Sequence, residues 1–525
     1  MTIESMSRSS RAAFIASKEQ GTLEPIDDII VGRDVLELVS SAMYIDPMTV
    51  YREYVQNAAD AIDDARRTGV LSPGQTGDVS ITIDSNSRTI RIRDNGTGIS
   101  NEEFARKMTT LGASAKRGTN ARGFRGVGRL AGLGYAQEVI FRSRAEGDQS
   151  VHELTWDCRK LKTALRQGAG DIGDLIRSVA TLRKREAADH PSRFFEVEMR
   201  GVIRIRSDRL MSPAAVEEYL GQVAPVPFAP DFSFGHDIRS VLAPVVELGE
   251  LNIQIEGNER PVYRPHRDVF MPDGVKTVKF DRLSISEING MEGELAAIVW
   301  ILHHDYEGAL PNATGVKGLR LRCGNVQIGD HNLLEELFPE PRFNSWAVGE
   351  IHVIDRKIVP NGRRDNFDQN AHYHNLVNQL TPAAREITRL CRTNSIRRNW
   401  LRDIEVQKQS VNQIIDLLEQ AVISADEQAK YVSKGADCFG RLEKALQRKI
   451  VSDQEIAEMS AEIALLRSRF ELVGNAADTP SSLAMLGEQD RRSFSRFCEL
   501  LYECAPNQAS AKVLVDKMLA RLSGS

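Results

Sequence analysis

Residues Tyr51 to Ala65 read YREYVQNAADAIDDA, and their spacing predicts a single helix. Glu53, Asn57 and Asp60 follow one another at steps of four and three residues, so they share one narrow stripe of that helix. Desolvating three polar groups costs several kcal/mol unless each of them finds a partner. The stripe is therefore either a solvated face of a surface helix or the wall of a site for a polar ligand, such as a triphosphate with its hydrated Mg²⁺. Much of the remaining surface of the helix is apolar, through Val55, Ala58, Ala59 and Ile62.

Two strands are predicted after this helix, at Val79–Ile83 and Thr89–Asp94, because both segments alternate with a period of two. Asp94 shares a face with the two isoleucines of its strand, so its carboxylate is expected to point inward, where it needs a hydrogen-bond donor. Gly96 and Gly98 follow directly, and at a glycine the backbone can approach a flat ligand without a Cβ atom in the way.

A glycine-rich segment, Gly123–Gly128, then reads GFRGVG and leads into an apolar run from Leu130 to Tyr135. Glycine-rich turns that open a helix present free N–H groups and the positive end of the helix dipole to a phosphate group. The segment therefore predicts a phosphate-binding turn followed by a helix.

In this order along the chain, the three motifs resemble the nucleotide-binding motifs of the gyrase, heat-shock chaperone, histidine kinase and MutL (GHKL) ATPase superfamily. The resemblance implies a Bergerat-fold α/β sandwich that binds ATP and Mg²⁺. It implies the nucleotide-binding residues Asn57, Asp60, Asp94, Gly96, Gly98, Ser114, Lys116, Gly123, Gly126, Val127 and Gly128, with Asn57 as the Mg²⁺ ligand.

The resemblance also implies a role for several of these side chains. Asn57 would give its carbonyl oxygen to Mg²⁺, and Asp94 would accept the adenine amino hydrogen. Gly126 and Gly128 would let backbone amides meet the phosphates. Glu53 would orient and deprotonate the attacking water; histidine kinases place no catalytic glutamate four residues before the magnesium asparagine, so the chain resembles the hydrolases of the superfamily.

The connection from Gly112 to Gly123 is long, polar and glycine-bearing, which is typical of a mobile lid beside a phosphate site. Ser114 and Lys116 are candidate nucleotide contacts there, with a solvated loop as the alternative. The chain departs from the superfamily further on, where relatives carry Gly-Thr before a strand and this sequence has Phe194, Phe195 and Glu196.

A length of 525 residues predicts about three domains. The fold class expected is α+β, with a flexible tail over 1–25, the ATP-binding sandwich over 26–230, an α/β middle domain over 231–385 and an all-α region over 386–525. The last of these has two apolar seams, from Leu401 to Val422 and from Ile456 to Val473. Each runs in three- and four-residue steps, which fits an antiparallel helical hairpin or a coiled-coil dimer.

The middle segment is expected to contain strands at 251–255, 295–302, 319–322 and 346–354, and it resembles the middle domain of the ninety-kilodalton heat-shock chaperones. That resemblance implies that Arg364 reaches the γ-phosphate across the domain boundary, a task suited to a guanidinium because it is always charged and forks onto oxygens. The alternative is that Arg363 and Arg364 are surface charges paired with Asp365 and Asp368. The chaperone resemblance covers about the first 385 residues and leaves out the helical tail.

A net charge of −5 argues against a globally electrostatic nucleic-acid binder. Six scattered cysteines without a C-x-x-C pair favour reduced thiols in a cytoplasmic protein, and the sequence has no apolar run of the roughly 18 residues that a membrane helix needs. The leading interpretation is a heat-shock protein 90-like ATPase that acts on protein clients as a homodimer. The alternative is a MutL- or MORC-like clamp acting on DNA or in a prokaryotic defence system, for which the sequence offers Arg200, Arg204, Arg206 and Arg209. An ATP-binding adaptor without turnover is a third interpretation, which Glu53 weakens.

Overall fold

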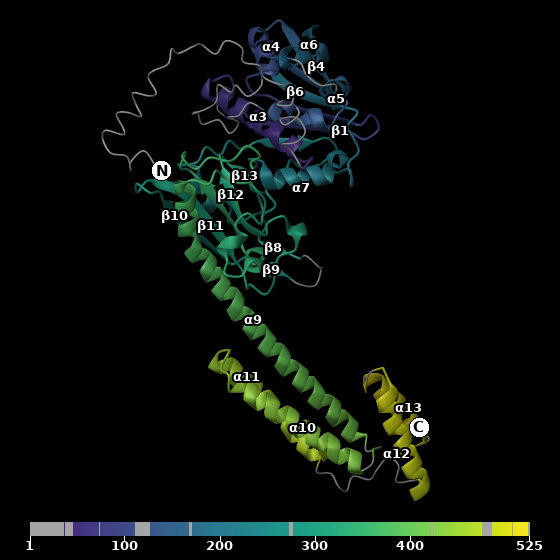
Figure 1. The fold of residues 1–525 in the computed structure, drawn as a ribbon. Coiled ribbons are helices and arrows are strands. Elements are labelled where there is room, and N and C mark those ends of the chain that lie inside the picture. Colours follow the sequence, from purple (N-terminus) through teal and green to yellow (C-terminus); the bar gives the residue numbers. More distant parts are fainter. Residues whose placement is uncertain are drawn as a thin grey trace, which may run out of the picture.

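The computed structural model describes Leu36 and residues 46–72, 74–110, 127–166, 171–271, 277–420, 422–423, 425–474, 486–506 and 508–522. Two α/β regions lie next to each other, and one long helix, α9, leads from the second of them to a group of helices at the C-terminal end (Figure 1). This α+β organisation confirms the predicted fold class.

The first region contains a seven-stranded sheet in the order β5-β4-β3-β6-β2-β1-β7. Neighbouring strands are antiparallel except β1 and β7, which are parallel. The strands are β1 (Asp78–Asp84), β2 (Thr89–Asp94), β3 (Glu138–Arg144), β4 (Ser150–Asp157), β5 (Ala180–Glu186), β6 (Phe194–Arg200) and β7 (Asn252–Ile255). The helices are α3 (Thr49–Arg67), α4 (Asn101–Thr109), α5 (Cys158–Arg166), α6 (Ile172–Val179) and α7 (Pro213–Val223), with 3-10 turns η3 (Gly128–Gly134) and η4 (Arg209–Met211).

The two faces of this sheet differ in character. Alternation along the strands gathers the apolar side chains on the face that carries α3, η3 and α7, where they form one core. On the other face Arg142 lies among three buried glutamates, with 2.7 Å contacts to Glu153 and Glu196 and a further contact to Glu198. The polar stripe of α3 and the end of β2 both belong to the face that carries the helices.

The strand predicted at 251–255 belongs to this first sheet and not to the second unit. It forms β7 and pairs in parallel with β1, with Val79 opposite Ile253. Ile253 and Ile255 are fully buried and complete the core under α3 and α7. One strand of the first sheet thus lies beyond the predicted boundary at residue 230.

One further local prediction needs correction. After α5 and α6 the chain continues into the edge strand β5, which pairs with β4. The apolar run after Gly128 forms the 3-10 turn η3 and not an α-helix. Three glycines within these seven residues, Gly128, Gly132 and Gly134, disfavour a regular α-helix.

The second region is built on a five-stranded sheet in the order β10-β11-β14-β12-β13 and a small hairpin, β8-β9. The helix α8 covers one face of the larger sheet and the first half of α9 covers the other. The elements are α8 (Gly235–Leu242), β8 (Val269–Phe270), β9 (Val278–Lys279), β10 (Arg282–Asn289), β11 (Leu295–His303), η5 (Asn312–Thr314), β12 (Gly318–Cys323), β13 (Val326–Ile328), η6 (Glu335–Leu337), η7 (Pro341–Trp346) and β14 (Val348–Val353).

A buried ionic network joins the two α/β regions. Glu350 on β14 accepts hydrogen bonds from Arg264 at 2.5 Å and from Arg322 at 2.6 Å. Arg322 also donates to the backbone oxygens of Gln222 at 2.7 Å and Ala224 at 3.4 Å, at the C-terminal end of α7. A guanidinium at that end of a helix satisfies carbonyl groups that have no partner within the helix. The network therefore fastens α7 to the second sheet.

The helix α9 (Ala371–Glu419) is 49 residues long and runs through the predicted domain boundary at 385/386. Its first half packs on the second sheet, and its second half packs on α10 (Ala425–Leu446) and α11 (Asp453–Gly474). The sequence does not reveal that one helix crosses this boundary, because the helix carries two apolar stripes in succession, one for each core. Beyond it lie α12 (Glu488–Cys504) and α13 (Gln508–Leu522).

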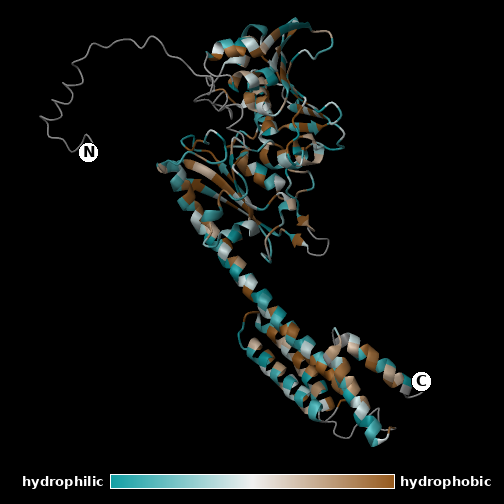
Figure 2. Ribbon diagram, turned by 45° about the vertical axis from the view of Figure 1, so that its right-hand side comes forward, coloured by the Kyte–Doolittle hydropathy of each residue, from teal (hydrophilic) through white to brown (hydrophobic). Residues whose placement is uncertain are grey.

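The two predicted apolar seams meet within one chain. Side chains of both, including Ile404 and Val411 on α9 and Ile463 and Phe470 on α11, share one core with α10. Hydrophobic residues accordingly colour the C-terminal helices where they lie side by side (Figure 2). The third helix, α10, was not predicted. Among the described helices, none is both long enough and apolar enough to cross a membrane.

Candidate functional site

The polar stripe of α3 lies inside the molecule. Glu53 is 6% exposed and Asp60 is 4% exposed, whereas Asn57 is partly exposed. Burial of two acids on one helix face argues against the solvated-face interpretation. It leaves a wall of carboxylate and amide oxygens, which are the donor atoms that Mg²⁺ prefers.

The carboxylate of Glu53 lies directly against Gly128. A Cβ atom added at Gly128 would be 2.2 Å from Glu53 Oε2, so any other residue there would push this carboxylate out of its present position. The contact is held in place by Tyr54, whose hydroxyl accepts the N–H of Gly132 at 3.0 Å and donates to the carbonyl of Arg129 at 3.2 Å. The predicted general base and the end of the predicted phosphate-binding turn are thus brought together.

Asp94 ends β2 on the same face and is 5% exposed. Burial raises the pKa of Asp94 to about 7, although the Gly96 N–H, which donates to its carboxylate at 2.9 Å, and the charge of Arg193 both act to lower the pKa. A buried carboxyl group with this pKa changes its charge near neutral pH. A ligand N–H group directed at it would stabilise the ionised form.

The two glycines after Asp94 have packing roles of their own. A Cβ atom on Gly96 would lie 2.7 Å from the Cβ of Ala61, and the neighbouring Thr97 N–H donates to the Ala61 carbonyl at 3.2 Å. Gly98 has a φ of +66°, and a Cβ atom there would be 2.2 Å from the carbonyl oxygen of Arg144. Glycine is therefore required at both positions to pack this loop between α3 and the end of β3.

The loop that carries Arg364 reaches the start of α3. Arg52 Nη2 lies 3.4 Å from Glu53 Oε1 and donates to the backbone oxygen of Arg363 at 3.0 Å. Arg364 itself has a φ of +57°, and its carbonyl accepts the N–H of Gly329 at 2.9 Å. The guanidinium of Arg52 thereby links Glu53 to the segment for which the sequence predicts contact with the γ-phosphate.

Arg52 was missed by the sequence analysis, although a signal for it exists. Arg52 lies in the first turn of α3 and is buried. A cation in the first turn opposes the helix dipole, and its burial adds a desolvation cost. Its contacts with Glu53 and Arg363 offset the unfavourable dipole interaction and the desolvation cost.

Phe195 occupies the position where the superfamily pattern fails. Phe195 pairs with Asp94 across β6 and β2, so the two side chains share the helical face. The ring of Phe195 is partly exposed, and its centroid is 6.2 Å from that of Phe141. This chain therefore offers an aromatic ring beside Asp94, whereas Glu196 points to the opposite face and pairs with Arg93 and Arg142.

Four of the predicted nucleotide contacts lie outside the described residues: Ser114, Lys116, Gly123 and Gly126. Val127 is described, and its carbonyl accepts the N–H of Leu130 at 2.9 Å. The lid and most of the phosphate-binding turn thus stay predictions.

The residues that are described fit a magnesium nucleotide. Asp94 is a buried acceptor whose pKa indicates that it needs a further donor. Glu53 and Asn57 put oxygen atoms on one helix face, and the Glu53 carboxylate lies against Gly128. Asn57 would hold Mg²⁺, and Asp94 would hold an adenine amino group.

Comparison with known proteins agrees with this arrangement. Residues 45–170 match the family model described as "Histidine kinase-, DNA gyrase B-, and HSP90-like ATPase". This segment runs from just before α3 to just after α5, and so contains all three motifs and the residues for which a lid is predicted. The superfamily resemblance inferred from those motifs is confirmed.

The individual relatives that match this chain are chaperone proteins named HtpG. The HtpG of Klebsiella pneumoniae subsp. pneumoniae is 28% identical over 210 residues, which are 35% of this chain and 32% of the relative. The HtpG of Enterobacter sp. is 27% identical over the same shares, and that of Polaromonas naphthalenivorans is 26% identical over 203 residues, 34% of this chain and 30% of the relative. The alignments thus span about a third of the length of these relatives.

Proposed function

We propose that this protein binds Mg²⁺-ATP between α3 and the end of β2, hydrolyses it, and uses the cycle as a heat-shock protein 90-like chaperone. The observation that carries the proposal is the position of the Glu53 carboxylate. It is buried against Gly128 and is linked through Arg52 to the loop of Arg363 and Arg364.

Nucleotide binding is assigned to the two polar walls of the site. Asp94 accepts the adenine amino hydrogen, and Phe195 lies beside it on the same face. Asn57 would hold Mg²⁺ through its side-chain oxygen, and the ion would offset the negative charge of the phosphates. Asp60 extends the same stripe by one helical turn and completes the buried polar wall.

Hydrolysis is assigned to groups from both α/β regions. Glu53 orients the attacking water and takes its proton, a role that needs a carboxylate within one water of the γ-phosphate. Arg364 offsets the charge that develops on the phosphoryl group, for which a guanidinium is suited by its permanent charge and forked donors. Arg52 positions both groups, because it bonds the Glu53 carboxylate and the backbone next to Arg364.

The chaperone assignment is supported by the similarity to HtpG proteins and by the contact of the Arg364 loop with the nucleotide-binding region. We infer a homodimer that acts on protein clients. Purified protein is expected to delay aggregation of a thermally unfolding reporter enzyme only when Mg²⁺-ATP is present. Equal aggregation with and without nucleotide would remove the chaperone assignment and leave the ATPase assignment intact.

The DNA-clamp alternative has less support. Arg200 is paired with Glu198 at 2.5 Å, and Arg204 lies 3.7 Å from Asp208, so two of the four arginines that favoured it have acidic partners. Binding of duplex DNA with a steep salt dependence would restore this alternative, since each phosphate contact adds to the salt slope.

Phosphate release tests the enzymatic part of the proposal. Wild-type protein is expected to release phosphate from ATP in the presence of Mg²⁺ and to lose this activity in excess EDTA. Hydrolysis that persists in EDTA, or that is absent with Mg²⁺ although ATP binds, would contradict the assigned roles of Asn57 and Glu53.

A further inference from the structure

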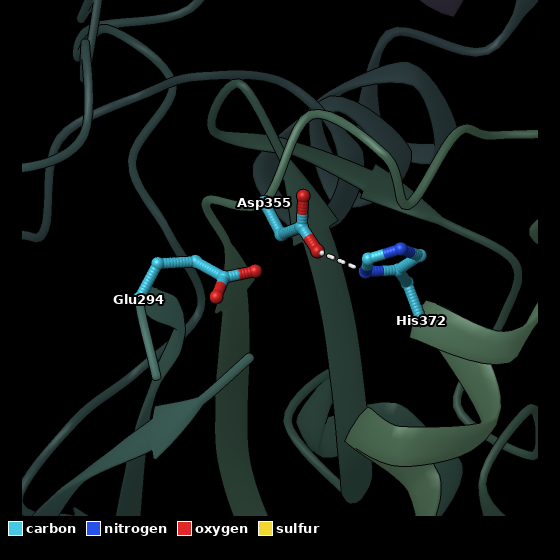
Figure 3. Close-up of side chains that lie close together, drawn as sticks. All are labelled: Glu294, Asp355 and His372. Carbon is cyan, nitrogen blue, oxygen red and sulfur yellow. Dashed lines mark hydrogen bonds and ion pairs between the residues drawn. The ribbon is translucent and has the colours of Figure 1, made fainter. Parts of the chain in front are cut away.

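Far from the nucleotide-binding motifs in the sequence, three potential metal ligands converge in the second α/β region. Glu294 comes from the turn between β10 and β11, Asp355 follows β14, and His372 lies in the first turn of α9 (Figure 3). One ligand atom from each side chain lies within 4.8 Å of the other two. The three elements are separate in the sequence, so the fold alone brings these atoms together.

Two of the three side chains are already oriented toward each other. The Asp355 carboxylate, whose side chain is 6% exposed, lies with Oδ2 3.0 Å from His372 Nδ1. Its other oxygen, Oδ1, accepts the backbone N–H of Lys357 at 2.8 Å. This bond fixes the carboxylate plane and leaves Oδ2 directed at the cluster.

Glu294 contributes an acceptor that lacks a donor. Its Oε2 accepts the backbone N–H of Glu292 at 3.0 Å, whereas Oε1 is buried and makes no hydrogen bond with the described part of the chain. The carboxylate lies over Gly290, where a Cβ atom would come within 2.2 Å of Oε1. A buried carboxylate oxygen without a partner is costly, and here it is next to a second carboxylate.

A cation would satisfy both carboxylates. The side-chain ammonium of Lys357, two residues after Asp355, bonds Glu292 Oε1 at 3.0 Å. We propose that Glu294, Asp355 and His372 bind a divalent transition-metal ion, with Zn²⁺ as the ion that this donor set fits. Imidazole nitrogen with two carboxylate oxygens suits Zn²⁺ and disfavours Mg²⁺ and Ca²⁺, which take oxygen ligands.

The geometry requires a small contraction. Tetrahedral Zn²⁺ with ligand distances of about 2.0–2.2 Å holds neighbouring ligand atoms roughly 3.4 Å apart. The three ligand atoms lie within 4.8 Å of one another, so side-chain rotations that bring the most distant pair together by up to roughly 1.4 Å are sufficient. Three protein ligands leave the fourth position for water.

The ion would connect the first turn of α9, through His372, to the loops that flank β11 and β14 of the second sheet. Two other contacts already do so, since Asn375 and Gln379 on α9 both donate to the carbonyl of Asn289, at 3.1 and 2.6 Å. Because α9 is about 70 Å long at 1.5 Å per residue, a small rotation at its root displaces the C-terminal helices by a large distance. Metal binding is thus expected to fix the direction in which α9 leaves the sheet.

The test is Zn²⁺ titration of the metal-stripped full chain in nucleotide-free buffer, followed by calorimetry. The variants are His372→Ala and, as a matched control, His374→Ala, which removes an exposed imidazole two residues further along α9. Wild type and His374→Ala are expected to bind one more Zn²⁺ per chain than His372→Ala. Glu294→Gln, which keeps the side-chain volume, is expected to weaken that site by about 10-fold or more.

The comparison between the two histidine variants separates this site from adventitious binding by the six cysteines. Equal Zn²⁺ stoichiometry and affinity in wild type, His372→Ala and Glu294→Gln would overturn the proposal. So would a Zn²⁺ stoichiometry lowered equally by His372→Ala and His374→Ala. Neither outcome bears on ATP binding, which uses other residues.

Discussion

Two buried carboxylates in neighbouring regions of the molecule have opposite surroundings. Glu350 in the second sheet is fully buried but is bonded by Arg264 and Arg322, with His352 at 3.1 Å. Burial acts to raise the pKa of Glu350, yet the two guanidinium groups hold it well below its ordinary value. Asp94 in the first sheet is almost as buried, and its pKa is raised to about 7.

The two carboxylates differ in how far the protein itself compensates their charge. Glu350 has its charge compensated by the protein, and its network ties α7 to the second sheet. The carboxylate of Asp94 has a hydrogen bond from Gly96 and the more distant charge of Arg193. A buried acid whose environment raises its pKa is a candidate for completion by a ligand.

The largest expected effect concerns Glu53, the proposed catalytic carboxylate. Glu53→Gln keeps the volume of the side chain against Gly128 but removes the base, so ATP turnover should fall by about 10²–10⁴-fold. ATP affinity should stay within about threefold, because the lost group acts on water and not on the nucleotide. Phosphate-release kinetics and calorimetry of the same preparation measure both quantities, and wild-type turnover in the variant would remove Glu53 from the mechanism.

Glu350→Ala tests the structural half of the comparison. Removing this carboxylate leaves Arg264 and Arg322 buried without their counter-charge, which should destabilise the fold by about 3–5 kcal/mol. Glu287→Ala, at an exposed position of the same sheet, is the matched control and should change stability by less than about 0.5 kcal/mol. Thermal melts of the two variants measure the difference, and equal melting temperatures would show that the network does not support the fold.

Asp94→Asn should have the opposite effect on stability. In wild type without nucleotide, the raised pKa means that stability is fully present below about pH 3.8 and declines as the pH rises through about 7. Asparagine carries no charge and keeps the acceptor for the Gly96 N–H. The free energy of unfolding of the variant should therefore exceed that of wild type by about 2–4 kcal/mol at pH 8 and by less at pH 5, and thermal melts at the two pH values measure the difference.

The same substitution should cost nucleotide affinity. An asparagine amide that accepts from Gly96 directs its NH₂ group toward the adenine amino group, so two donors face each other. ATP affinity should fall by at least about 10-fold. A variant that is neither stabilised at pH 8 nor impaired in binding would place Asp94 among ordinary structural residues, like Glu350.

The smallest effect is expected from pH alone. Only ionised Asp94 offers its full acceptor strength to the adenine amino group, so ATP affinity should rise as the pH increases toward about 7 and level off above it. Between pH 6 and 7 the change should be at most about 10-fold. Titrations of wild type at several pH values measure it, and a flat profile would show that Asp94 stays ionised throughout this range.

Local periodicity predicted the elements that carry the site. The helix around Glu53 and the strand ending in Asp94 follow from apolar spacing within a few residues, and the structure has them as α3 and β2. The strand β7 was predicted, but its place in the first sheet was not, because its partner β1 is about 170 residues away in the sequence and nothing local specifies that pairing. The continuity of α9 through the predicted boundary was not predicted, because its two successive apolar stripes pack on two different cores and resemble two separate domains.

The site itself was predicted to the extent that its residues lie in short motifs. Glu53, Asn57, Asp94 and Gly128 fall on or beside the same face of the first sheet. Arg52 was missed because its role depends on a backbone oxygen of Arg363, more than 300 residues away. Every residue has a backbone oxygen, so the identity of residue 363 does not indicate that Arg52 bonds there.

The central claim is that an adenine nucleotide binds between α3 and the end of β2. Calorimetric titration of the full chain with ATP and with ADP, in excess Mg²⁺ at pH 8, tests it most directly. One site per chain is predicted for each nucleotide in wild type, with markedly weaker binding in Asp94→Asn. Absence of binding by wild type up to millimolar nucleotide, or equal binding by wild type and Asp94→Asn, would contradict it.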